Sequence, residues 1–109
     1  MPFNETLADR VRKLLRGDHS VVEKKMFGGL AFMVNGHMCC GIVGSDLVVR
    51  TGPDGLEDAL RQPHARPMNF TGRPMKGFVY VAPSGYRTES ALWLWTERGL
   101  EFALRQPPK

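Results

Sequence analysis

A series of short apolar runs, each ended by a turn signal, constrains the fold of this chain more than any other feature. The runs are Val21–Phe27, Leu30–Val34, His37–Val43 and Leu47–Thr51. Each run has the length of a strand rather than of a helix. Asn35 and Gly36, between the second and third runs, are typical of a two-residue hairpin turn because both tolerate positive φ. The segment therefore predicts an antiparallel meander of four strands.

Helices are predicted on both sides of the meander. Residues 4 to 16 carry apolar side chains at helical spacing, Asn4 can cap this helix, and Gly17 is a stop signal. A shorter helix is predicted over residues 54–62, where Pro63 ends it. Both helices are amphipathic, so each has one face to bury against the sheet.

The longest helix is predicted at the C-terminal end, from a cap at Thr88 or Ser90 to about Arg105. Its apolar stripe consists of Ala91, Leu92, Trp95, Gly99, Phe102 and Ala103. Glycine inside a helix costs about 1 kcal/mol relative to alanine. We therefore expect Gly99 to lie at a close contact between this helix and the sheet.

The chain of 109 residues corresponds to one small domain, so we expect a single domain over residues 1–109. Residues 63–76 contain three prolines and are expected to be mostly loop or an irregular edge, and residues 77–82 to form a further strand. The predicted fold class is α+β, with an antiparallel sheet, helices on one face and the order α-β-β-β-β-α-β-α. Phe78 and Tyr80 would occupy one face of the last strand, and Val79 and Val81 the other.

The sheet face without helices is expected to be open in a monomer. Its apolar side chains would be Met26, Ala31, Met33, Met38 and Val49. Because a large exposed apolar patch usually marks an interaction site, we expect a homodimer.

The net charge of +4 is mildly basic, and no apolar run is long enough to span a bilayer or form a signal-peptide core. The cysteines, Cys39 and Cys40, are neighbours in sequence, which disfavours a disulfide between them. They indicate reduced thiols and a cytoplasmic protein. Because neighbours in a strand point to opposite faces, we expect one of them on each face, no structural zinc and no cofactor.

A stretch without acidic residues runs from Asp58 to Glu89 and carries most of the candidate interaction surface. The candidate residues are Arg50, Arg66, Arg73, Lys76, Arg87 and Trp93. Cations near aromatic rings can bind nucleic acid, but they can equally hold a loop together. The stretch contains no recognition helix for the major groove and no known nucleic-acid-binding motif. We therefore expect at most weak, sequence-independent binding to DNA or RNA through the Arg66–Arg87 stretch.

A remote alternative is a small enzyme or ligand-binding domain that uses a thiol. His37 and Cys39 would share a strand face, two residues apart. A thiol nucleophile also needs a lowered pKa and an oriented base. The sequence offers no orienting carboxylate beside this pair, so catalytic residues are not assigned.

Three separated motifs resemble the N-terminal domain of the TfoX/Sxy family, named for a regulator of bacterial competence. They are KMFGGL at 25–30, RPMKG at 73–77 and LRQPPK at 104–109. The resemblance implies an α+β domain and no catalytic residues. In the competence regulators a second, helical domain follows; this chain ends at Lys109, so we do not expect their role to transfer whole.

The resemblance therefore implies a non-enzymatic regulatory or interaction module that binds a protein. Weak nucleic-acid binding is the alternative, and strong dependence of binding on salt would favour it.

Overall fold

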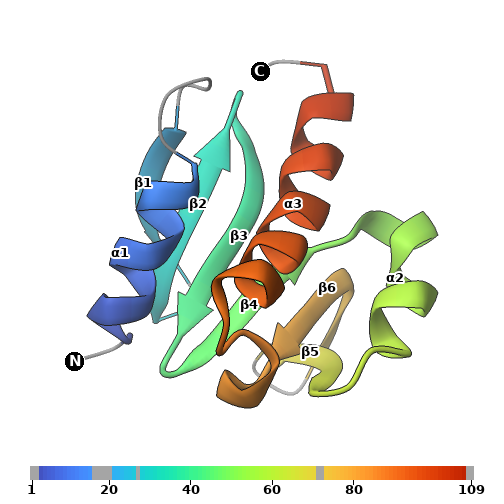
Figure 1. The fold of residues 1–109 in the computed structure, drawn as a ribbon. Coiled ribbons are helices and arrows are strands. Elements are labelled where there is room, and N and C mark those ends of the chain that lie inside the picture. The colour runs from blue at the N-terminus through green and yellow to red at the C-terminus, as the bar shows by residue number, and fades with distance from the viewer. Residues whose placement is uncertain (1–2, 16–20, 27, 71–72, 108–109) are drawn as a thin grey trace.

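The structure is a computed structural model that describes residues 3–15, 21–26, 28–70 and 73–107, without the side chains of 70 and 73–75. Its elements are α1 (Glu5–Leu14), β1 (Val21–Met26), β2 (Gly29–Val34), β3 (His37–Val43), β4 (Asp46–Arg50), α2 (Gly52–Leu60), β5 (Ala65–Phe70), β6 (Arg73–Val81), the 3-10 turn η1 (Pro83–Gly85) and α3 (Glu89–Arg105). The strands form one antiparallel sheet in the order β1-β2-β3-β4-β6-β5. Figure 1 shows α1 beside β1 and β2, α3 along β3 and β4, and α2 beside β6.

The predicted α+β class and the order of elements are confirmed, and β5 adds one edge strand to the sheet. This strand occupies the segment expected to be a loop or an irregular edge. Its pairing with β6 shifts register between Pro67 and Asn69. Proline has no N–H for a sheet ladder and is confined to edges, so an irregular outer strand can accommodate Pro67 where a central strand could not.

Side-chain caps begin the first and last helices. The Asn4 carboxamide oxygen accepts from the Leu7 N–H at 3.1 Å, and the Thr88 hydroxyl oxygen accepts from the Ala91 N–H at 3.1 Å. These caps satisfy N–H groups that have no partner inside the helix. No helix among the described residues is long and apolar enough to cross a membrane.

Arg12 of α1 forms an ion pair that joins this helix to β1, one of the two edge strands. Its guanidinium donates to both carboxylate oxygens of Glu23 at 2.7 Å each, and to Asp9 at 2.7 Å. The hydrogen bonds from Arg12 hold the pKa of Glu23 below its ordinary value of 4.5. A fork of two parallel bonds fixes geometry as well as charge, so this pair sets the position of α1 over β1.

The lowered pKa of Glu23 predicts a dependence of stability on acid. A carboxyl whose pKa is depressed by folding stabilises the native state above its unfolded pKa, and this contribution is lost as pH falls through the folded pKa. We expect Glu23→Gln to be less stable than wild type at pH 7, with the difference shrinking below about pH 4. Urea unfolding of both proteins across this range measures it; a difference that stays constant would contradict the role of the ion pair.

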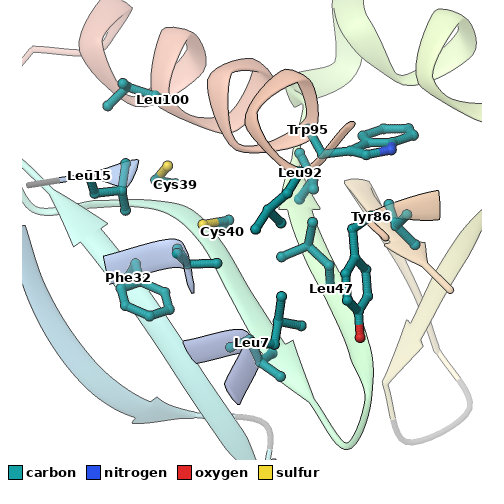
Figure 2. Close-up of a cluster of buried hydrophobic side chains, with 14 of the residues drawn as sticks. Leu7, Leu15, Phe32, Cys39, Cys40, Leu47, Tyr86, Leu92, Trp95 and Leu100 are labelled. Atoms are coloured by element: carbon teal, nitrogen blue, oxygen red, sulfur yellow. The ribbon is translucent and has the colours of Figure 1, made fainter. Parts of the chain in front are cut away.

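The main core lies between the sheet and the helices. Its largest fully buried side chains are Phe32, Leu7, Ile42, Leu47 and Leu92. Figure 2 shows Leu92 reaching down from α3 toward Leu47 and Cys40 on the sheet. Tyr86, just before α3, closes the edge of this cluster and donates its hydroxyl to the Ser45 carbonyl at 2.6 Å.

The two cysteines lie on the same face of the sheet, which corrects the expectation of opposite faces. Phe32 pairs with Cys40 and Met33 with Met38, so β3 carries one extra residue, Cys39, at a bulge. A bulge shifts the alternation of side chains by one position. Both thiols are therefore 0% exposed and belong to the main core, between the sheet and α3 (Figure 2).

The second face of the sheet is apolar but is not the open surface that the sequence suggested. Four of its side chains are at most 3% exposed: Ala31, Met38, Val48 and Met68. Partly buried side chains surround them, namely Met26, Met33, Val43, Phe78 and Tyr80. The expectation for Val49 is wrong: it belongs to the helix-covered core, and Val48 takes its place. Met68 of the edge strand β5 belongs to the same buried cluster as Ala31, Met38 and Val48.

A cleft beside α3 as the candidate functional site

The two predicted surface arginines with described contacts are engaged within the chain. Arg66 donates to Asp46 at 2.7 Å, and its guanidinium lies 4.7 Å from the centre of the Tyr80 ring. The guanidinium of Arg50 lies 4.6 Å from the ring centre of Phe102 and 5.5 Å from that of Phe78. Burial lowers the pKa of Arg50. These side chains stabilise the end of the sheet, the more ordinary of the two roles considered for them.

The other predicted surface residues give no common site. Lys76 and Arg87 are exposed. The side chain of Arg73 lies outside the described part of the chain. Trp93 is half-buried and packs against the main core, so its ring contributes to the packing of the fold.

The alternative based on His37 and Cys39 receives no support from the geometry. The His37 Nε2–H donates to the Pro107 carbonyl at 2.7 Å. The Cys39 thiol donates to the Thr96 carbonyl, and this thiol together with burial raises the pKa of Cys40 well above its usual value. A reactive cysteine needs a lowered pKa and access to substrate. The pKa of Cys40 is raised, and neither thiol is accessible because both residues are 0% exposed. The described residues contain no cluster of three or more side chains that could hold a metal ion.

An open cleft of about 570 Å³ lies beside α3. One wall of the cleft is α3, and the other is the turn after α2 together with η1. The α3 wall is Ala91, Leu94, Trp95, Glu97, Arg98 and Glu101, and the facing wall is Gln62, Pro63, His64, Ser84 and Gly85. The volume lies within the range of sites that bind small molecules or side chains. Apolar and polar groups both line it.

Trp95 connects this cleft to the core. Its side chain is 6% exposed, and its ring extends sideways from α3 instead of pointing into the sheet (Figure 2). The Arg98 guanidinium lies 5.1 Å from the centre of the ring and also bonds to Asp58 of α2 at 2.9 Å. No hydrogen-bond partner for the indole Nε1–H is found among the described residues. The Nε1–H is not one of the polar atoms that are buried without a partner, so it faces solvent.

The charge of the cleft is negative in a protein whose net charge is positive. Glu97 and Glu101 both line it, and neither forms an ion pair with a described residue. The guanidinium in the lining, that of Arg98, is neutralised by Asp58. Among the described residues, the cleft therefore presents two carboxylates that have no cationic partner.

His64 holds an unusual backbone conformation at the rim of the cleft. Its φ of 70° lies in the left-handed region, which a residue with a Cβ occupies at a cost. The other non-glycine residue with positive φ among those described, Asn35, belongs to the tight β2–β3 turn where this conformation is required. Ser84 and Gly85 line the cleft together with His64, which is exposed.

The conformation of His64 predicts that His64→Gly is stabilising. Glycine adopts positive φ without steric penalty, and the gain should be up to about 1 kcal/mol after its greater flexibility in the unfolded chain is subtracted. Urea unfolding measures the change. A loss of stability would show that the imidazole makes contacts worth more than the backbone strain.

Sequence reasoning did not find this cleft. The helical pattern separates Leu94, Glu97 and Glu101 from the apolar stripe, but much of the facing wall comes from a segment expected to be irregular. One signal was available: Leu94 is a large apolar residue off the stripe, and it is 60% exposed.

The structure is a small α+β domain with a helix-covered sheet and an open cleft beside α3, and comparison with known proteins places it in a family. The family model of the TfoX N-terminal domain matches residues 13–103. The chain belongs to this family, which confirms the resemblance; the match includes the motifs at 25–30 and 73–77 and ends before the one at 104–109. No curated protein and no solved structure matches the chain.

Proposed function

We propose that this TfoX N-terminal domain is a non-enzymatic regulatory module that binds a protein partner in the cleft beside α3. The observation that carries the proposal is the exposed Leu94 on the rim of a cleft of about 570 Å³. A concave, partly apolar surface of this volume is typical of a binding site, and the exposed Leu94 extends its apolar rim. The partner is a protein segment that places an apolar side chain against Leu94 and Ala91.

Two observations support a binding role over a catalytic one. Both thiols are buried in the main core, and the pKa of Cys40 is raised rather than lowered. In the cleft, Ser84 and His64 lie on the wall opposite Glu97 and Glu101, and no hydrogen bond joins them among the described residues. A nucleophile with its base and orienting carboxylate needs such bonds.

The test combines site-directed crosslinking with a matched surface control. A photoreactive amino acid replaces Leu94 in one version of the protein and Val22 in the other. Val22 is 52% exposed on β1, the edge strand away from α2 (Figure 1). We expect crosslinked protein products in the native cell from the Leu94 position, not from Val22, and their loss when Glu97 and Ala91 are replaced. Equal products from both positions, or none from Leu94, would contradict the proposal.

Weak nucleic-acid binding stays a prediction from the sequence. Arg66 is already paired with Asp46 and Arg50 is stacked on Phe102, so fewer cations of the proposed surface are available to phosphate groups. Dissociation constants should be no lower than about 10⁻⁶ M at physiological salt. Titration of labelled duplex and single strands measures them. Homodimer formation also stays a prediction from the sequence, and sedimentation velocity checks it.

A further inference from the structure

We infer that the segment bound in the cleft is cationic: a lysine or arginine next to an apolar residue, with a backbone carbonyl at Trp95. This inference rests on the proposed function, since it names the chemistry of the partner at the same cleft. Three features of the described residues support it: the uncompensated carboxylates, the indole donor and the apolar rim.

The carboxylates supply the charge selectivity. Glu97 is half-buried, Glu101 is exposed, and both line the cleft. They are four residues apart on α3, so they lie one above the other on the same helix face, where like charges destabilise each other. A cation between them removes this repulsion. An acidic segment would add to it.

Arg98 does not compensate for these carboxylates. Its guanidinium is held between Asp58, at 2.9 Å, and the face of the Trp95 ring. The charge of Arg98 is therefore paired with Asp58, whereas neither Glu97 nor Glu101 forms an ion pair with a described residue. Taken with Asp58, these described residues amount to three acids against one guanidinium.

The indole and the rim indicate a peptide rather than a free amine. The Trp95 residue is more than nine-tenths buried, and its Nε1–H has no acceptor among the described residues, although Trp95 is part of the lining. The Nε1–H is not one of the polar atoms that are buried without a partner, so it faces the solvent rather than the core. A peptide carbonyl would accept from this donor, while neighbouring side chains would reach Leu94 and the carboxylates together. A simple polyamine provides only the charge.

The experiment uses three synthetic peptides of equal length as probes. One alternates pairs of leucine and lysine, the second replaces every lysine with glutamate, and the third replaces every leucine with serine. Binding to the ¹⁵N-labelled protein is followed by NMR at the indole N–H of Trp95, assigned through Trp93→Phe. We expect the leucine–lysine peptide to shift this resonance, the serine–lysine peptide to bind more weakly, and the leucine–glutamate peptide not to bind.

Variants test the residues one by one. Glu97→Gln with Glu101→Gln should weaken the leucine–lysine peptide roughly tenfold, because each partly exposed ion pair contributes a factor of about 2 to 5. Trp95→Phe keeps an aromatic ring and removes the donor, and should weaken binding several-fold; because this variant has no indole resonance at position 95, its binding is followed at the backbone amides of α3. Glu5→Gln, an exposed acid on α1, is the matched control and should have no effect. Thermal unfolding of each variant confirms that it is folded.

The outcomes separate this inference from the proposed function. Preference for the leucine–glutamate peptide, unchanged affinity in the double glutamine variant, or no binding of any peptide overturns the cationic partner. Crosslinking from the Leu94 position can still succeed in that case, and the proposed function then stands with a partner of different chemistry. Failure of crosslinking together with failure of peptide binding overturns both.

Discussion

Trp95→Ala is expected to lower the free energy of unfolding by about 3–5 kcal/mol, as for other buried tryptophans. The side chain is 6% exposed and belongs to the main core, and its removal would enlarge the cleft inward to Leu92. The ring also supports Arg98, whose bond to Asp58 connects α3 to α2. Chemical denaturation of the variant and wild type measures the loss.

Trp93→Ala serves as the control for this effect. Trp93 is a tryptophan of the same helix, but it is half-buried and only packs against the edge of the core. Its removal should cost clearly less than that of Trp95, because less apolar surface returns to water. A loss below about 1 kcal/mol for Trp95→Ala would show that the ring is not part of the core.

Gly99→Ala is expected to destabilise the protein by about 2–3 kcal/mol, although alanine is the better helix former. A Cβ at this position would lie 2.8 Å from the carbonyl carbon of Cys39 and closer still to its oxygen. These are backbone atoms at the bulge of β3, so they cannot move aside as a flexible side chain can. The helix would have to shift away from the sheet.

Gly55→Ala is the matched control for Gly99. Gly55 also lies inside a helix, but a Cβ there meets only the Thr51 Cβ at an ordinary 3.5 Å. We expect this variant to gain about 0.5–1 kcal/mol from helix propensity. The two substitutions should therefore have opposite signs in the same unfolding experiment. A gain in stability for both would mean that α3 does not approach the sheet as closely as described.

Local signals in the sequence determined most elements of the fold. Asn4 and Thr88 are side-chain caps that act within three residues of themselves, so the starts of α1 and α3 could be predicted. Asn35 and Gly36 have the positive φ that their turn requires. The close contact expected at Gly99 is confirmed, because a glycine in the apolar stripe of a helix lets another backbone approach where a Cβ would block it.

Tertiary pairing decided what the local signals left open. The register of β2 against β3 inserts Cys39 as an extra residue, which brings both thiols to one face of the sheet. Val49 likewise lies on the helix-covered face and Val48 on the other, opposite to the expectation. Strand alternation cannot show a bulge, because the extra residue follows from pairing with another strand. The proline of β5 argued against a strand at this position, but it is tolerated because this strand forms the edge of the sheet.

The sequence by itself determined the family, the α+β class and the apolar stripe of α3, because these depend on motifs and on spacing along one segment. Only the tertiary structure decided the cleft. Its walls join residues 62–64 and 84–85 to α3, and none of these segments has a pattern of its own that marks a site. The carboxylates of α3 become a binding surface only because the turn after α2 and η1 fold against that helix, which no local periodicity encodes.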